Sequence, residues 1–292
     1  MQSTASTPVR PWLWLAPGLL VLGWWLYDLH FQWEAIVDYQ YGWMVALLAA
    51  YLTWERWPTR PTQDRPAPLW LCGLLVVLAT PLLVVAELYK NGIAGTPSTS
   101  FLVSIASTLY LAALVLYAWG RATLAHFLFP LLFLFVAVPL PQILWGPIVV
   151  GLQGLITALN VETLNLLGIP AVQHANVIQL PRCVVGVDEA CSGVRSLQSS
   201  IMATLFIGDL TLKRPGAKLA FLAAGMALAL VGNFFRSLFL SLTAHREGID
   251  ALKHLHDTAG WSVLLFTAGG MIVLAWVVGR WEKKSAALSR HE

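Results

Sequence analysis

Apolar runs long enough to cross a lipid bilayer recur along almost the whole chain, and they restrict the fold more than any other feature. A transmembrane helix needs about 20 mostly apolar residues. Charged residues make up only 11% of the chain, whereas a soluble domain carries about a quarter, so lipid has to cover much of the surface. The sequence therefore predicts an all-α polytopic membrane protein with about eight transmembrane helices, at residues 12–27, 42–54, 68–88, 101–119, 123–139, 191–209, 217–240 and 261–279.

The basic residues predict how these helices are oriented. If the N-terminus is cytoplasmic, twelve of the 18 Lys and Arg residues fall on the inner side: Arg10, Arg56, Arg60, Arg65, Arg121, Lys213, Arg214, Lys218, Arg280, Lys283, Lys284 and Arg290. Cytoplasmic loops are generally enriched in such residues. We therefore expect both termini in the cytoplasm.

Residues 143–169 test this orientation, because they are apolar enough to span the membrane. If they crossed it, the Lys213–Arg214 loop and the basic C-terminal segment would both face outward. Gln153, Asn160 and Glu162 also interrupt the apolar run. We interpret this segment as a re-entrant or interfacial helix with both ends on the outer side.

Residues 171–188 differ from the chain before them, because they are rich in β-branched residues and broken by Pro181 and Gly186. This pattern predicts a small β-hairpin on the outer surface. The chain shows no internal repeat, no linker and no pattern of a cleavable signal peptide. We expect one membrane domain, residues 1–292, with no separate soluble domain.

Three short motifs at the outer ends of apolar runs carry the candidate chemistry, and all lie within residues 189–261. In the first, Glu189-Ala190-Cys191-Ser192-Gly193-Val194-Arg195-Ser196, the cysteine lies at a predicted helix start. A helix N-terminus and a nearby cation both favour the reactive thiolate. Cys191 is thus a candidate nucleophile, with Arg195 and Glu189 in supporting roles.

The second motif is Asn233-Phe234-Phe235-Arg236, within an apolar run. A charge there costs at least about 2.5 kcal/mol at mid-membrane, so such residues usually face a cavity and serve function. Asn233 lies on the same helical face as Arg236. The pair is suited to donating hydrogen bonds to a substrate carbonyl; the alternative is an arginine that reaches the membrane surface.

The third motif is His256-Asp257-Thr258-Ala259-Gly260-Trp261. A neutral imidazole at His256, with Asp257 beside it, can exchange a proton near neutral pH. His245 and His254 are nearby competitors for this role. A metal site built from His254, His256, Asp257 and Cys191 is an alternative that we do not favour, because no second ligand cluster appears. We expect no metal and no cofactor.

The other two cysteines have simpler interpretations. Cys72 lies in an apolar span as a small core residue. Cys183 is predicted on the outer side, so a disulfide with Cys191 is conceivable in an oxidising compartment. The dense polar motif around Cys191 favours the nucleophile instead.

At these residues the chain resembles the exosortases, of the exosortase/archaeosortase group. The resemblance rests on Glu-Ala-Cys-Ser-Gly-x-Arg-Ser at 189–196, Asn-x-x-Arg at 233–236 and His-x-x-x-Gly at 256–260. Gly-x-Pro and Asn-x-Ile-x-Leu within 168–180 match as well. So does Tyr39-x-Tyr41-Gly42, although the family often has a histidine where Tyr41 stands.

The resemblance implies a polytopic enzyme of the bacterial inner membrane, with its active site at the periplasmic face. It implies a catalytic Cys191, Arg236 and His256. Substrates would be proteins that end in a PEP-CTERM-type signal: a short Pro-containing motif, a transmembrane helix and a basic cluster. The enzyme would be a cysteine transpeptidase or protease, similar to sortases by convergence, with a thioester intermediate. Partners would be the signal helix, membrane lipids and an exopolysaccharide or lipid-linked acceptor, but no nucleic acid.

A function of another class stays open from the residues alone. A transporter or assembly protein of an envelope polysaccharide pathway would use Arg236 and His256 to bind an anionic lipid-linked substrate. Cys191 would then be structural. Thiol labelling from outside the cell distinguishes the two, because a transporter has no need for an accessible, acidic thiol.

Overall fold

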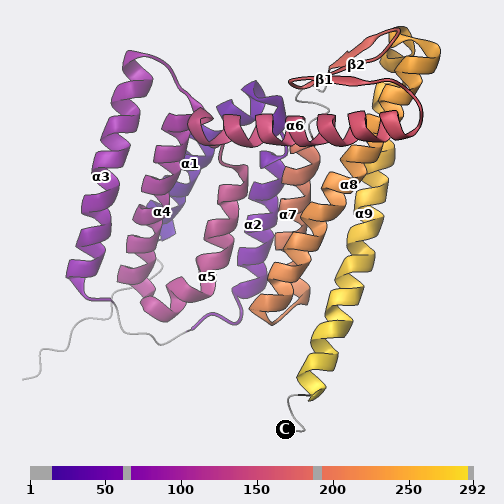
Figure 1. Cartoon of the computed structure of the whole chain (residues 1–292). Helices are drawn as coiled ribbons and strands as arrows, with labels where there is room; N and C mark the ends of the chain where they lie inside the picture. Colours follow the sequence, from indigo (N-terminus) through magenta and orange to yellow (C-terminus); the bar gives the residue numbers. More distant parts are fainter. Residues whose placement is uncertain (1–14, 62–66, 187–192, 289–292) are drawn as a thin grey trace, which may run out of the picture. The chain divides into compact units, whose positions relative to one another are not determined.

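The fold is known from a computed structural model, which describes residues 15–61, 67–186 and 193–288 (Figure 1). The description leaves out the side chains at 249–259, 261 and 284–288. The chain forms two compact units, residues 1–142 and 143–292. That the whole chain is a single membrane domain stays a prediction.

The N-terminal unit is helical throughout its described residues. Its elements are α1 (Leu15–Ala35), η2 (Val37–Tyr39), α2 (Gly42–Arg56), α3 (Leu69–Gly92), α4 (Pro97–Trp119), α5 (Arg121–Phe133) and η3 (Leu134–Ala137). The helix α4 contacts α1, α3 and α5, and α2 contacts α5 and η3. This arrangement makes α4 the central helix of the unit.

The start and the buried face of α4 follow from its sequence. Thr96 and Thr99 form a capping box, and Pro97 occupies the first turn, where its missing N–H is not needed. Ser100, Ser104 and Ser107 are almost fully buried. Small residues of this kind let helices approach closely in a membrane, and here the Trp25 indole of α1 donates a hydrogen bond to Ser104 Oγ at 2.8 Å.

Aromatic side chains complete the hydrogen bonding where α5 ends in the 3₁₀ turn η3. Trp33 Nε1 donates to the Ala137 carbonyl at 2.8 Å, and the Tyr41 hydroxyl donates to the Val136 carbonyl at 2.6 Å. The Tyr39 hydroxyl accepts the Leu140 N–H at 3.2 Å. A Cβ on Gly42 would lie 2.3 Å from the Trp33 ring, so only glycine fits there. The Tyr39-x-Tyr41-Gly42 pattern thus has a structural explanation.

The C-terminal unit contains a long helix, a small sheet and three further helices. Its elements are α6 (Gln142–Leu166), β1 (Val172–His174), β2 (Val177–Gln179), β3 (Val184–Gly186), α7 (Val194–Thr211), α8 (Pro215–Glu247) and α9 (Ile249–Leu288). The sheet is antiparallel in the order β1-β2-β3, with Ile178 opposite Gln173 and Val185. The predicted hairpin is therefore one strand short of the observed sheet.

The sheet is fixed to α6 and α8 by an apolar core and by Asn165. Ile156 and Leu164 of α6 pack with the buried Ile178 of β2, and Leu238 of α8 packs against them. The Asn165 side chain makes two hydrogen bonds with the backbone of Ala171. Its Nδ2 donates to the Ala171 carbonyl at 3.0 Å, and its Oδ1 accepts the Ala171 N–H at 2.9 Å. These contacts set the position of the segment that leads toward residue 191.

Glycines bring α7, α8 and α9 into close contact. A Cβ on Gly225 of α8 would lie 2.3 Å from Thr204 Cγ2 of α7, and one on Gly270 of α9 would lie 2.5 Å from Leu228 of α8. Small residues at such positions are the usual means of packing helices in lipid, where burial from water gives no driving force. The three helices therefore form one tightly packed group.

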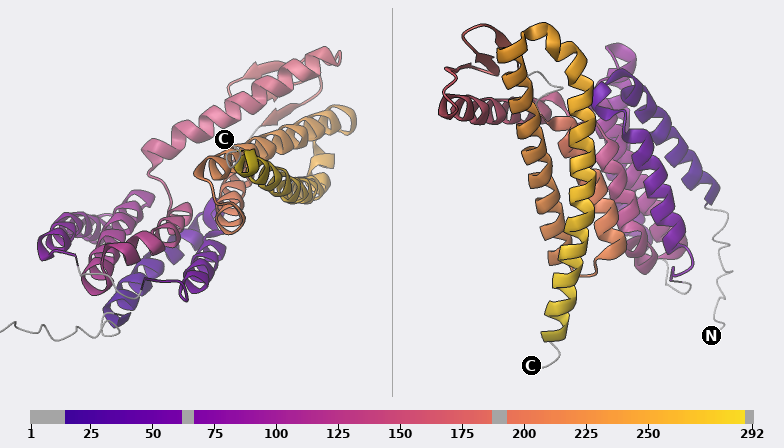
Figure 2. Two further views of the ribbon diagram at one scale, coloured as in Figure 1. Left: turned by 90° about the horizontal axis from the view of Figure 1, so that it is seen from below. Right: turned by 90° about the vertical axis from the view of Figure 1, so that its right-hand side faces the viewer.

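The helix α6 runs across the direction of α7, α8 and α9 within this unit, as Figures 1 and 2 show from three sides. It is a single continuous helix of 25 residues, so it does not turn back on itself. Its outward residues are apolar, among them Leu155, Leu159 and Leu166, which are 41–88% exposed. Of the two predicted forms, interfacial or re-entrant, this geometry favours the interfacial one.

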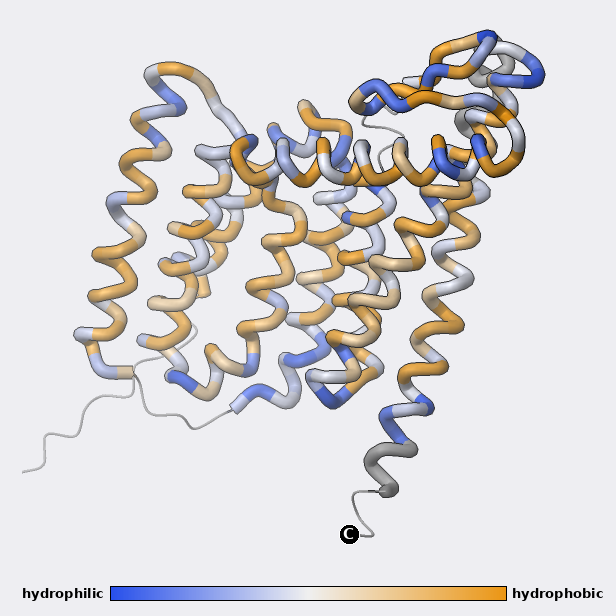
Figure 3. The backbone as a smooth tube through the Cα atoms, in the orientation of Figure 1, coloured by the Kyte–Doolittle hydropathy of each residue, from blue (hydrophilic) through white to orange (hydrophobic). Residues whose placement is uncertain are grey.

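Five helices of the described chain are long and apolar enough to cross a membrane, by length and composition. They are α3, α4, α6, α8 and residues 262–283 of α9. Hydrophobic residues fill their middle stretches (Figure 3). The protein is therefore a multi-pass membrane protein, but a count of eight spans stays a prediction. By length and composition alone, α6 also qualifies, although it was predicted not to cross.

Charged side chains connect α7, α8 and α9 near the turn between α7 and α8. The Glu282 carboxylate of α9 accepts the backbone N–H groups of Lys213, at 3.0 Å, and of Arg214, just before α8 begins. A carboxylate at a helix N-terminus satisfies unpaired N–H groups and complements the helix dipole. Lys218 pairs with the buried carboxylate of Asp209 at 2.8 Å. The first contact holds the α7–α8 turn against α9, and the second joins α8 to α7.

Candidate active site

The helix α8 carries two polar side chains of the candidate site one turn apart. Asn233 is 1% exposed and Arg236 is half-buried. At 1.5 Å per residue, Arg236 lies about 31 Å from Pro215, where α8 begins. That is about the thickness of the hydrocarbon core, so a helix starting at one membrane surface brings Arg236 to the other, where a charge costs less.

Asn233 contacts the motif that contains Cys191. Gly193, the residue before α7, has a φ of +84°. A Cβ on it would lie 2.7 Å from Asn233 Nδ2 and 2.8 Å from Asn233 Cγ. Glycine is needed here for two reasons, the left-handed backbone and the close approach of the amide. The end of the first motif and the start of the second thus touch.

Arg236 lies close to the third motif. A Cβ on Gly260 of α9 would lie 3.9 Å from Arg236 Nη2, so the guanidinium lies beside a helix surface without a side chain. In a helix, each residue turns by about 100°, which places His256 about 40° around α9 from Gly260, one turn earlier. The described contacts of α8 therefore reach both other motifs.

The same helical geometry separates His256 from its two competitors. His254 lies about 120° around α9 from Gly260. His245 lies nine residues after Arg236 on α8, which is about 180° around that helix. Of the two histidines on α9, His256 therefore has the angular position closer to that of Gly260, which lies beside Arg236, and His245 lies on the opposite side of α8 from Arg236.

Four of the predicted site residues fall wholly or partly outside the described chain. Cys191 and Glu189 lie in the segment 187–192, which is not described. His256 and Asp257 lie in α9, but their side chains are outside the description. Arg195 is the second residue of α7 and is exposed. The predicted roles of these residues stay predictions.

Two buried polar side chains near the motifs were not predicted as part of the site. Asn160 of α6 is fully buried and donates a hydrogen bond from Nδ2 to Ser237 Oγ at 2.8 Å, next to Arg236. Gln198 of α7 is 7% exposed, and its Oε1 has no hydrogen-bond partner among the described residues. A polar residue inside an apolar run was the sequence signal for both side chains. The sequence analysis used this signal only for Asn160, which it described as an interruption of the apolar run.

Cys183 and Cys72 have the environments of structural residues. Both are free thiols. Cys183 donates a weak hydrogen bond from Sγ to the Ala244 carbonyl at 3.5 Å, and burial raises the pKa of its thiol. A raised pKa lowers the fraction of reactive thiolate. Cys183 is therefore poorly suited to act as a nucleophile. The alternative disulfide would involve Cys191, which lies outside the described residues.

Among the described residues, no group of three or more His, Cys, Asp or Glu side chains could hold a metal ion.

A family model described as transmembrane exosortase (Exosortase_EpsH) matches residues 33–276 of the chain, whereas no curated protein and no solved structure matches. The matched stretch is well over half of the chain and includes all three motifs. The chain therefore belongs to the transmembrane exosortase family.

Proposed function

We propose that the protein is a membrane-embedded cysteine transpeptidase or protease, in which Cys191, Arg236 and His256 carry the chemistry. The observation that carries this proposal is that α8 approaches two glycines closely: Asn233 lies against Gly193, and Arg236 lies beside Gly260. The helix that bears the arginine is therefore close to one residue of the cysteine motif and one residue of the histidine motif. Three segments distant in the sequence thus share one end of the α7–α9 group.

In the proposed reaction, the Cys191 thiolate attacks the carbonyl carbon of the scissile peptide bond. The oxyanion that forms accepts hydrogen bonds from Arg236 and Asn233. When the carbon–nitrogen bond breaks, His256 donates a proton to the leaving amine, and a thioester remains on Cys191. Water or an acceptor amine then attacks the thioester, releases the thiolate and gives the cleaved or transferred product.

The surroundings of Arg236 suit the role of an electrophilic stabiliser. Its guanidinium lies beside Gly260, a residue that has no side chain of its own. The planar guanidinium can donate two parallel hydrogen bonds, which an ammonium cannot. Asn233 is held by its contact with Gly193 and is nearly fully buried, so its amide is already oriented.

The substrate class comes from the family. The proposed substrates carry a C-terminal sorting signal with a short Pro-containing motif, a transmembrane helix and a basic cluster. An exopolysaccharide or lipid-linked acceptor would resolve the thioester in a transfer reaction. The chemistry requires neither a metal nor another cofactor.

We also propose that the protein resides in the bacterial inner membrane, with both termini in the cytoplasm and the motifs at the periplasmic face. The distribution of basic residues supports this orientation. Reporter fusions after residues 185 and 250 should read periplasmic, and a fusion at residue 215 cytoplasmic. A cytoplasmic reading at 185 would invert the proposed topology.

The test of function is processing of a tagged reporter protein that carries such a signal, in cells producing Cys191→Ala. Processing should stop while the variant accumulates in the membrane at the wild-type level. Cys72→Ala and Cys183→Ala are the matched controls and should retain processing. Normal processing by Cys191→Ala would exclude the thiol mechanism. Cys191→Ser should be far slower, because a hydroxyl is a weaker nucleophile without a strong base.

A further inference from the structure

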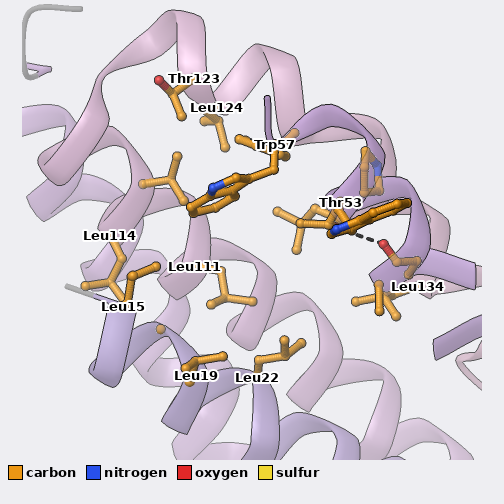
Figure 4. Close-up of a pocket in the computed structure, with 18 of the residues that line it drawn as sticks. Leu15, Leu19, Leu22, Thr53, Trp57, Leu111, Leu114, Thr123, Leu124 and Leu134 are labelled. Atoms are coloured by element: carbon orange, nitrogen blue, oxygen red, sulfur yellow. Dashed lines mark hydrogen bonds between the residues drawn. The ribbon is translucent and has the colours of Figure 1, made fainter. Parts of the chain in front are cut away.

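The N-terminal unit contains a partly open apolar cavity of about 620 Å³ between α1, α2, α4 and α5 (Figure 4). The cavity is lined mainly by leucine, alanine and aromatic side chains of these four helices. Leu19 and Leu22 of α1 lie on one side, and Leu111 and Leu114 of α4 lie nearby. All of the lining belongs to one unit of the chain, and none of it belongs to the three motifs.

The hydroxyl groups in the lining do not offer hydrogen bonds to a polar ligand. Thr53 Oγ1 donates to the Ala49 carbonyl at 2.8 Å, and Thr123 Oγ1 donates to the Trp119 carbonyl at 3.2 Å. Each hydroxyl proton therefore takes part in a hydrogen bond to a backbone carbonyl four residues earlier in the chain. A water molecule needs two to four polar partners to be bound in a cavity, so most of this space suits hydrocarbon.

The exception is one end of the cavity, where Arg60 and Trp57 contribute to the lining. The Arg60 guanidinium stacks over the Trp57 ring at 4.5 Å and donates a hydrogen bond from Nη1 to the Trp57 carbonyl at 2.7 Å. Arg56 adds a second cation and Glu55 one anion, so the sequence 54–61 has a net positive charge. Tryptophan and arginine together are typical of the membrane–water interface.

The size of the cavity matches one hydrocarbon chain. A methylene group takes up about as much space as a water molecule in the liquid, ~30 Å³. The cavity therefore has room for about 20 methylene groups, the size of one long acyl chain.

We propose that this cavity binds an anionic phospholipid of the surrounding membrane. One acyl chain lies between α1, α2, α4 and α5, and the headgroup phosphate accepts hydrogen bonds from Arg60. The apolar lining, the size and the Arg60 guanidinium at one end each match a part of such a molecule. The site is separate from the proposed catalytic chemistry, and its occupancy can be measured without a substrate.

The chain offers a matched pair of variants for blocking the cavity. Gly18 of α1 lines it, and a Cβ on Gly18 would meet nothing within 4 Å. Gly73 of α3 is equally unobstructed but does not line it. Gly18→Phe should therefore fill the space without a clash, and Gly73→Phe should place the same ring elsewhere in the same unit.

The experiment is native mass spectrometry of the purified full-length protein after incubation with equal amounts of phosphatidylglycerol and phosphatidylcholine. The wild type and Gly73→Phe should each retain one phosphatidylglycerol, and Gly18→Phe should retain none. Phosphatidylglycerol should also raise the melting temperature of the first two proteins and not of the third. All three should elute as single species, which excludes misfolding as the cause.

Arg60→Gln tests the headgroup contact, with the exposed Arg121→Gln, whose residue does not line the cavity, as control. Arg60→Gln should still bind a lipid but lose roughly fivefold of the preference for phosphatidylglycerol over phosphatidylcholine, whereas Arg121→Gln should not. Retention of phosphatidylglycerol by Gly18→Phe would overturn the proposal. So would an unchanged lipid preference in Arg60→Gln, or a peptide segment found cross-linked within the cavity.

Discussion

Asn233 occupies the space that a side chain at Gly193 would need, since a Cβ on Gly193 would lie 2.7 Å from Asn233 Nδ2. Gly193 also has a φ of +84°, which residues with a Cβ rarely adopt. The two residues belong to different motifs, one before α7 and one within α8. The backbone that follows residue 191 is therefore positioned by the side chain of the second motif.

Gly193→Ala should destabilise the protein and abolish processing. The left-handed backbone alone should cost about 1–2 kcal/mol for alanine, and the contact with Asn233 adds to it. Thermal unfolding in detergent measures the loss. Gly186→Ala is the control, because its Cβ would meet nothing within 4 Å. Adding Asn233→Ala to Gly193→Ala should restore part of the stability; no restoration would mean that the steric contact is unimportant.

Gly260→Leu should abolish processing with little loss of stability. A Cβ at Gly260 would meet Arg236 Nη2 at 3.9 Å, an ordinary contact, so Gly260→Ala should be tolerated. The longer leucine side chain would displace the guanidinium. Gly269→Leu on the same helix is the control, because its Cβ would meet nothing within 4 Å. Full activity in Gly260→Leu would show that the position of the guanidinium does not matter.

Arg236→Lys should lose about 100- to 1000-fold in rate, the usual effect of losing an oxyanion donor. Arg195→Lys should keep measurable activity, because Arg195 is an exposed residue at the start of α7. Turnover of the reporter at matched membrane levels compares the two. A dead Arg195→Lys beside an active Arg236→Lys would assign the electrophilic role to Arg195.

Loss of the buried hydrogen bond between Asn160 and Ser237 should weaken the packing of α6 against α8. Asn160→Ala leaves the Ser237 hydroxyl without this partner, which should cost about 1–3 kcal/mol. Thr163→Ala on the same helix removes an exposed hydroxyl that bonds only its own helix backbone at 2.7 Å, so its stability should change little. Equal melting temperatures for the two variants would contradict the importance of the buried bond.

The pH dependence of thiol labelling should distinguish Cys183 from an unfolded cysteine. In a Cys72→Ala, Cys191→Ala background, burial raises the pKa of Cys183, so alkylation should begin at higher pH in the folded protein than in denaturant. Because the folded state holds the proton more tightly, this thiol stabilises the fold fully below its unfolded pKa. That stability is lost as pH rises through the folded pKa. Identical labelling profiles would exclude the effect.

The long elements of the fold were predictable because apolar runs mark them directly. Residues 143–169 were predicted as one helix outside the set of crossing helices, and α6 covers 142–166 and runs across α7–α9. The third strand of the sheet was missed, since strands of three residues leave almost no periodic pattern. The ends of α8 and α9 were also missed, because their polar extensions leave the apolar run while remaining helical.

For the candidate site, the motifs were visible in the sequence but their contacts were not. The cost of a charge in lipid pointed to Arg236, and spacing placed Asn233 on the same face. Nothing in the spacing indicated that Asn233 would lie against Gly193, or Arg236 beside Gly260, because those distances depend on how three helices pack. Asn160 was noted only as an interruption of an apolar run, since its partner lies on a different helix.

The contacts of Glu282 and Gly260 fix the number of residues between them on α9. Along α8, Pro215 and Arg236 are separated by about 31 Å, and along α9, Gly260 and Glu282 are separated by about 33 Å. The two helices are therefore matched at both ends, by the Glu282 contacts and by the Gly260 contact. Inserting or deleting one residue between 261 and 281 would rotate one end by about 100° relative to the other. This stretch should accept many substitutions but no change in the number of residues.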